Sequence, residues 1–258
     1  MVLALDVGNT NIKIGLFDGD EMIQSWRMAT DLVRTADEYG IALMQLLRSG
    51  GVEPSQIDGT IVSSVIPQLN YTIEHMLDYY LHTKPLMVGP GIKTGLNIQY
   101  ENPREVGSDR IVNSVCAYNK YGGPVIVVDF GTATTFNAIS RDGRFLGGCI
   151  CPGVKTSVEA LVNATAKLPT IELVKPSRII GKTTVTNMQA GVTYGVVGQV
   201  RYILETMKKE MGEKNIKVVA TGGLSELVKD EVGLIDVVDR RLSLLGIKMI
   251  YDVNNPKG

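Results

Sequence analysis

The sequence has few of the residues on which zinc and disulfide chemistry depends. It holds 3 cysteines and 2 histidines among 258 residues. Cys149 and Cys151 are separated by a single residue, which is too close for an easy disulfide, and no cysteine spacing matches a zinc-binding pattern. A chain with so little histidine is also a poor candidate for a zinc enzyme or a Ser-His-Asp hydrolase. The scarcity of cysteine indicates a reducing, cytoplasmic compartment.

Neither an excess charge of one sign nor a long apolar run is present. Lys and Arg total 26 against 27 Asp and Glu, for a formal net charge of −1. We therefore expect no nucleic-acid partner and no polybasic membrane contact. No apolar segment approaches the roughly 18 residues that span a bilayer. A strand-forming run follows Met1 directly, so we expect no signal peptide and no membrane association.

Two segments about half a chain apart share one pattern. Each begins with an apolar strand-forming run, reaches an Asp, continues with Gly two residues later and then with small polar residues. The first runs from Asp6 to Asn11 and the second from Asp129 to Thr134, and a second β-prone run follows each. A fixed carboxylate can hold a cation, Gly admits phosphate oxygens close to the backbone, and Asn and Thr donate to anions. The pattern predicts a duplicated hairpin that binds the phosphates of a nucleotide and its metal.

The same turns also occur in proteins that bind no phosphate. One Asp-x-Gly-Asn/Thr turn alone would most often be purely structural, and it is the repetition that favours phosphate binding. The other phosphate-binding motifs are missing: the segment from Gly148 to Lys155 is one residue out of register for a P-loop, and no Gly-x-Gly-x-x-Gly follows a strand.

The order of elements predicts an α/β protein with mixed sheets. Apolar runs predict strands, and apolar residues at helical spacing predict helices. Gly122-Gly123-Pro124 is the strongest break near the middle of the chain. Three glycines in the longest helix (191, 195 and 198) would let another backbone approach. The expected strands are 2–6, 12–17, 21–27, 60–65, 85–88, 125–128, 136–139 and 217–220; the expected helices are 35–47, 71–81, 109–118, 157–165, 187–209 and 242–251, with an irregular loop at 168–180.

Three motifs in order resemble the two phosphate segments and the adenosine segment of the actin, sugar kinase and heat-shock ATPase superfamily. They are Asp6-Val7-Gly8-Asn9-Thr10, Asp129-Phe130-Gly131-Thr132-Ala133-Thr134 and Ala220-Thr221-Gly222-Gly223. Within this superfamily the chain resembles the type III pantothenate kinases. The segments that carry this resemblance are Pro103–Arg110, Gly147–Gly153 and Gly181–Thr184. The compact length agrees with it.

The resemblance implies two ribonuclease H-like (actin-like ATPase) domains with mixed sheets and ligands in the cleft between them. Residues 1–118 would form the N-terminal domain, with the first phosphate hairpin and the acceptor loop. Residues 119–258 would form the C-terminal domain, with the second hairpin and the adenosine segment. The implied reaction is ATP-dependent phosphorylation of pantothenate to 4'-phosphopantothenate, the first step of coenzyme A biosynthesis.

The resemblance also implies a set of site residues and partners. Asp109 matches the general base, and Asp129 matches a ligand of the monovalent cation, potassium or ammonium. Mg²⁺ would accompany ATP, and the active species would be a homodimer in which Thr184 reaches the substrate from the partner chain. The matches to the ATP site are Asp6, Val7, Gly8, Asn9, Thr10, Asn11, Ile12, Lys13 and Thr132; those to the pantothenate site are Tyr100, Gly107, Ser108, Asp109, Arg110 and Thr184.

The residues of the acceptor loop favour phosphoryl transfer even without the family resemblance, although another interpretation exists. Asp109 follows a Gly-Ser pair that opens a helix, where a carboxylate can be held near a substrate oxygen. Arg110 offers a planar fork for a carboxylate or phosphate. Ser108 and Asp109 could instead form a plain helix N-cap and first turn. A nucleotide-binding regulatory or transcription accessory protein on the same fold would need the hairpins without this Asp-Arg pair, and a filament-forming ATPase would need larger insertions.

Overall fold

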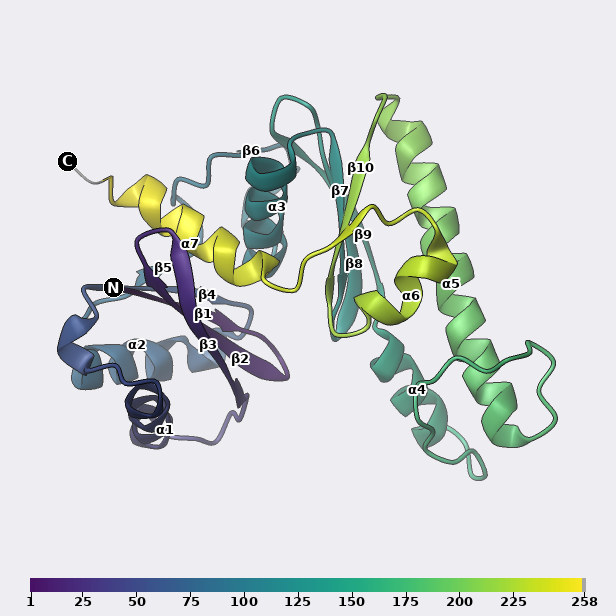
Figure 1. Cartoon of the computed structure of the whole chain (residues 1–258), viewed down its shortest axis with the longest axis horizontal. Coiled ribbons are helices and arrows are strands. Elements are labelled where there is room, and N and C mark those ends of the chain that lie inside the picture. Colours follow the sequence, from purple (N-terminus) through teal and green to yellow (C-terminus); the bar gives the residue numbers. More distant parts are fainter. Residues whose placement is uncertain (257–258) are drawn as a thin grey trace. The chain divides into compact units, whose positions relative to one another are not determined.

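The computed structural model describes residues 1–256, which divide into two compact units. Unit 1 comprises residues 1–96, residues 101–116 and the segment that starts at Arg241; unit 2 comprises residues 97–100 and 117–240. Figure 1 shows the chain coloured from the N- to the C-terminus. The last helix therefore belongs with the N-terminal unit, whereas the sequence predicts one boundary between residues 118 and 119.

Unit 1 is built around a five-stranded mixed sheet in the order β3-β2-β1-β4-β5. Strand β1 pairs antiparallel with β2 and parallel with β4. Helices α1 and α2 contribute to the core on one face, and α3 and α7 to the core on the other. The strands are β1 (Val2–Val7), β2 (Asn11–Asp18), β3 (Glu21–Ala29), β4 (Gly59–Ser64) and β5 (Leu86–Met87). The helices are α1 (Ala36–Ser49), α2 (Pro67–Leu81), α3 (Ser108–Tyr121, with its last turn counted in unit 2) and α7 (Leu242–Asn254), with short 3₁₀ turns at Pro54–Gln56 and Pro103–Glu105.

The alternation of side chains along the strands decides which polar residues of unit 1 meet. Leu3 points into the core beneath α1 and α2, whereas Ala4 points into the core beneath α3 and α7. Successive side chains of a strand face opposite sides, so Asp6 lies on the α3/α7 face. Its register partners, Lys13 on β2 and Ser63 on β4, share that face. The polar ends of three strands are thus directed toward the helices that carry the acceptor loop and the C-terminal segment.

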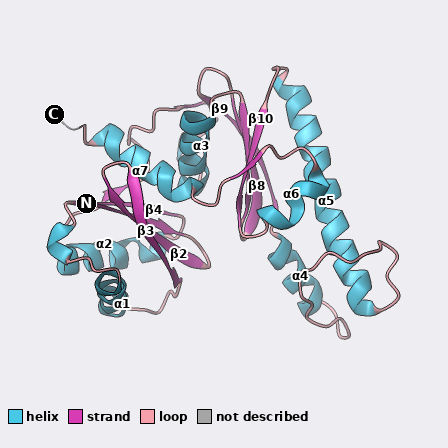
Figure 2. Ribbon diagram, in the orientation of Figure 1, coloured by secondary structure: helices cyan, strands magenta, loops and turns pink. Residues whose placement is uncertain are grey.

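Unit 2 repeats this plan in a six-stranded sheet of order β11-β10-β7-β8-β9-β6. Strand β7 pairs antiparallel with β8 and parallel with β10, as β1 does with β2 and β4. Figure 2 shows the sheet and the helices α5 and α6, which pack on one side of it. The strands are β6 (Asn97–Ile98), β7 (Val125–Phe130), β8 (Ala133–Ile139), β9 (Arg144–Pro152), β10 (Lys217–Gly222) and β11 (Val237–Val238). The helices are α4 (Val154–Asn163), α5 (Thr184–Met211) and α6 (Ser225–Val232).

The two mixed sheets confirm the predicted α/β class and the duplicated hairpin topology. Residues 168–180 contain neither helix nor strand, in agreement with the sequence. Strand β9 and the eight-residue helix α6 were not among the predicted elements. In residues 1–256 no helix is both long enough and apolar enough to cross a membrane.

Candidate active site

The first phosphate hairpin of unit 1 carries a buried acid paired with a lysine. Asp6, at the end of β1, is 7% exposed. The Lys13 ammonium lies 3.0 Å from Asp6 Oδ2 and donates a second bond, of 3.3 Å, to Ser243 Oγ at the start of α7. The C-terminal helix thus helps to hold the lysine of the hairpin. The ammonium lies between the acid of β1 and the first turn of α7.

The turn of this hairpin is fixed by bonds to its carbonyl groups. Gly8 N donates to Asn11 O across the turn at 3.1 Å. Thr30, which follows β3, donates its hydroxyl to Gly8 O at 2.6 Å and its backbone N–H to Thr10 O at 3.1 Å. These bonds occupy carbonyl oxygens that would otherwise repel an anion. They leave the turn suited to bind phosphate.

The acceptor loop places a partly buried carboxylate at the start of α3. Asp109 Oδ1 accepts a 2.8 Å hydrogen bond from Arg110 N. A Cβ on Gly107 would lie 2.5 Å from that same Oδ1. Any larger residue at position 107 would therefore displace the carboxylate. Burial raises the pKa of the Asp109 carboxyl above its usual value; the Arg110 N–H bond lowers it in part, and the negative charge of Asp6 raises it again. A carboxylate with this environment is a stronger base than an exposed aspartate.

The second hairpin, in unit 2, carries its acid on a strand whose two neighbours place a threonine opposite it. Asp129 lies at the end of β7, in register with Thr135 on β8 and Thr221 on β10. Both threonines are buried, at 8% and 5% exposure. Val128 points into the core beneath α5 and α6, so by strand alternation Asp129 and the two threonines face the opposite side. Where unit 1 sets a lysine beside its acid, unit 2 sets neutral oxygen donors.

The turn of the second hairpin is held by the start of α4. Gly131 N donates to Ala133 O at 3.1 Å, while Gly153 N and Thr156 Oγ1 donate to Thr132 O at 3.1 and 2.8 Å. A Cβ on Gly153 would stand 2.2 Å from Thr132 O and 2.5 Å from Gly131 O. The close approach of α4 to the turn therefore requires glycine at position 153.

Replacing Gly153 with alanine should displace the second phosphate turn. We expect the KM for ATP to rise about tenfold, because a misplacement of about 1 Å in a positioning element can cost up to about a hundredfold. Steady-state kinetics over a range of ATP concentrations measures this. Gly89→Ala is the matched control, since no atom lies within 4 Å of its added Cβ. If both variants keep the wild-type KM, the α4 contact does not shape the ATP site.

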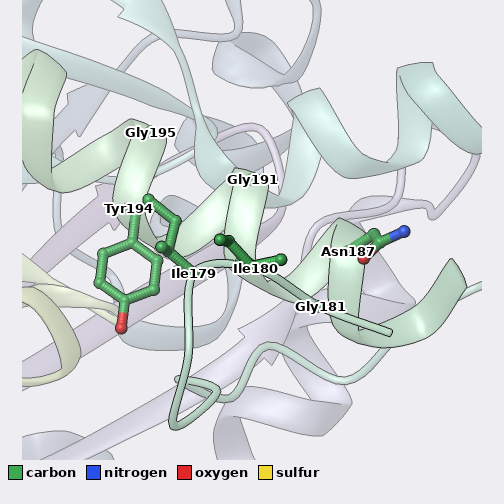
Figure 3. A pocket seen from close by; sticks show the side chains of 8 residues that line it. Ile179, Ile180, Gly181, Asn187, Gly191, Tyr194 and Gly195 are labelled. Atoms are coloured by element: carbon green, nitrogen blue, oxygen red, sulfur yellow. The ribbon is translucent and has the colours of Figure 1, made fainter. Parts of the chain in front are cut away.

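The remaining residues predicted for the acceptor site lie in unit 2. The Tyr100 ring packs against the Phe145 ring with centroids 6.4 Å apart. Thr184 is the first residue of α5, and the N-cap Thr183 accepts a 3.1 Å bond from Thr186 N. Beside this helix start an open groove of about 540 Å³ runs between the 179–181 loop and α5. Figure 3 shows its lining residues: Ile179, Ile180, Gly181, Asn187, Ala190, Gly191, Tyr194 and Gly195.

The predicted site residues are divided between the two units, and two further serines lie beside those of unit 1. Unit 1 holds residues 6–13 together with the acceptor loop 107–110, and unit 2 holds the other four: Tyr100, Asp129, Thr132 and Thr184. The sequence did not indicate Ser63 or Ser243 as site residues. For Ser63 a signal existed, since a Ser-Ser pair ends a buried strand. For Ser243, which is 230 positions from Lys13, there was none.

Comparison with solved structures defines the class of protein. A provisionally described 2-dehydro-3-deoxygalactonokinase from Sinorhizobium meliloti is 12% identical, with a TM-score of 0.65 over 100% of this chain and 98% of that one. A provisionally described Baf family transcriptional activator from Campylobacter jejuni is 19% identical, with a TM-score of 0.61 over 98% of both chains. A ROK family glucokinase from Streptomyces griseus, solved with glucose and AMPPNP, is 14% identical, with a TM-score of 0.52 over 98% of both chains. The fold is that of the two-domain actin-like ATPases and sugar kinases.

The sequence itself gives the narrower assignment. The family model of the type III pantothenate kinases matches residues 2–206, which is most of the chain. The chain belongs to the type III pantothenate kinase family. Family and fold together support a small-molecule kinase.

Proposed function

We propose that this protein transfers the γ-phosphoryl group of ATP to the primary hydroxyl of pantothenate, the first step of coenzyme A biosynthesis. Family membership supports the substrate. The observation that carries the chemistry is the partly buried Asp109 carboxylate, whose pKa is raised by desolvation and by the charge of Asp6 on the first phosphate hairpin. A base of this kind, near a phosphate-binding turn, is what hydroxyl phosphorylation requires.

In the proposed reaction Asp109 accepts the proton of the pantothenate hydroxyl. The hydroxyl oxygen forms a bond to the γ-phosphorus as the bond from that phosphorus to the bridging oxygen breaks, and ADP leaves with the electron pair. Lys13 offers positive charge to the phosphates, and Arg110 offers a two-pronged contact to the pantothenate carboxylate. Mg²⁺, when bound with ATP, neutralises charge on the β- and γ-phosphates.

Asp129 is the proposed ligand of a monovalent cation, potassium or ammonium. Its register partners Thr135 and Thr221 supply neutral oxygen atoms, the donor type that hard cations prefer. Among residues 1–256 no group of three or more His, Cys, Asp or Glu side chains converges. One carboxylate with hydroxyls suits a weakly held, singly charged ion.

We also propose that the active species is a homodimer that joins along α5. This helix has 28 residues, about 42 Å at 1.5 Å per residue. Apart from the neighbouring backbone of α5 itself, a Cβ added to any of three of its glycines (191, 195 and 198) would meet no described atom within 4 Å. Ile179 and Ile180, at the edge of the groove, are 64% and 80% exposed. A second copy would cover these apolar side chains and the glycine face, next to Thr184.

Mixing two inactive variants tests the shared site. Asp109→Asn removes the base, and Thr184→Arg blocks the proposed contact from the partner chain. If Thr184 acts across the interface, mixed dimers contain one site with both residues intact and recover up to roughly a quarter to a half of wild-type activity, as two-fold symmetry requires. No recovery after demonstrated subunit exchange would place Thr184 in the site of its own chain.

A coupled ADP-release assay, run with and without pantothenate, tests the proposed function. A kinase releases ADP much faster when its acceptor is present. A nucleotide-binding regulatory or transcription accessory protein would release ADP at the same low rate in both cases. Glucose is the control acceptor, because the fold is shared with sugar kinases. Turnover with glucose but not with pantothenate would keep the kinase class and reject the substrate.

A further inference from the structure

Two serine hydroxyls join the end of β4 to the start of α3. Ser63 Oγ donates to Ser108 Oγ at 2.9 Å, and Ser108 Oγ donates to the carbonyl oxygen of Ser64 at 2.9 Å. A hydroxyl has a single proton, so Ser108, which donates to the carbonyl, has to be the acceptor of the Ser63 bond. The direction of the chain is therefore fixed. It runs from strand side chain to helix side chain and back to the strand backbone.

The chain of hydroxyls lies beside the groups proposed for catalysis. Ser63 is 1% exposed and is the register partner of Asp6 on β1, while Ser108 is 9% exposed and directly precedes Asp109. Ser108 Oγ makes both of these hydrogen bonds to β4, so the hydroxyl holds the first turn of α3 against that strand. A buried hydroxyl that loses its partner is unfavourable, which keeps the pair in contact.

We propose that Ser63 is a positioning residue that sets the Asp109 carboxylate against the acceptor hydroxyl. Ser63 fixes Ser108, and Ser108 fixes the first turn of α3. The absence of a Cβ at Gly107 and the Arg110 N–H then fix the orientation of the carboxylate within that turn. The base is thereby tied to β4, the strand that pairs with the strand of the first phosphate hairpin. The inference rests on the proposed function, because the group that Ser63 positions is the proposed base of that reaction.

Replacing Ser63 with alanine tests this role. We expect kcat to fall about tenfold while the KM for ATP stays within about twofold, because a small displacement of a base lowers the rate of the chemical step without changing nucleotide binding. Thr60→Val is the matched control. Thr60 is also 1% exposed, lies on the same strand, and makes a 3.1 Å hydroxyl–hydroxyl bond to Thr83. The control should lower the melting temperature as Ser63→Ala does, yet leave kcat unchanged.

A double-mutant cycle separates positioning from a general structural effect. In the Asp109→Asn background, Ser63→Ala should cause no further loss of the residual rate, measured by single-turnover transfer of labelled phosphate. A further tenfold loss in that background would overturn the inference, and so would equal kcat values for Ser63→Ala and Thr60→Val. Wild-type turnover with pantothenate would survive either result. If the wild type itself lacks acceptor-dependent turnover, the proposed function fails first and the role of Ser63 falls with it.

Discussion

Asp109→Asn is expected to lower kcat by about 10²–10⁴-fold, the usual contribution of a general base. The amide keeps the shape of the carboxylate but cannot take the proton of the acceptor hydroxyl. ATP binding should stay within about twofold of wild type, because the phosphate turns do not include this residue. Steady-state kinetics and nucleotide titration measure the two effects. A variant that turns over within about threefold of wild type would show that Asp109 is not the base.

The same substitution should make the fold more stable at neutral pH. Burial raises the pKa of Asp109 in the folded protein, so the ionised group lowers folding stability once the pH rises above its unfolded value of 3.8. The stability advantage of Asn should therefore grow as the pH rises from 3.8 to the higher pKa of the folded protein, and stay constant above it. Asp142→Asn is the control, for which the opposite pH dependence is expected. Hydrogen bonds from Ser140 and Arg144 lower the pKa of Asp142. Loss of this carboxylate should therefore destabilise the folded protein at neutral pH and do so less in acid. Equal pH dependence of the two variants would contradict this assignment.

Asp129→Ala is expected to remove the response to potassium together with most of the activity. The threonines opposite Asp129 on the neighbouring strands carry only neutral oxygens, so removing the carboxylate removes the proposed negative ligand of the ion. Rates are measured as potassium is titrated at constant ionic strength, with choline as the replacing cation. Asp142→Ala, a surface acid of the same unit, should keep the wild-type response. An unchanged potassium response in Asp129→Ala would remove this residue from the cation site.

The sequence predicted the features that depend on neighbouring residues. The two hairpins were visible because strand, Asp, Gly and strand follow one another within about a dozen residues. The mixed sheets followed from the order of elements, and the structure confirms them. Helix α5 was predicted as 187–209 and extends over 184–211, because the Thr183 cap begins the helix earlier than the apolar periodicity indicates.

The features that depend on distant residues could not be predicted. Nothing local shows that α7 returns to unit 1; its Ile247 and Ile250 are apolar like any core residue, and only the tertiary fold places them in the core that contains Ala4. The bond from Lys13 to Ser243 depends on that return. The Ser63 to Ser108 bond likewise depends on how α3 meets β4.

If this chain phosphorylates the primary hydroxyl of pantothenate, the phosphate ester can be detected directly. The most direct measurement is mass spectrometry and phosphorus NMR of the acceptor after incubation of the purified protein with ATP, Mg²⁺, potassium and pantothenate. We expect pantothenate to gain one phosphoryl group as a stable ester on its primary hydroxyl, in amounts equal to the ADP formed, and Asp109→Asn to form almost none. Unmodified pantothenate in the presence of bound or hydrolysed ATP would contradict the proposed function.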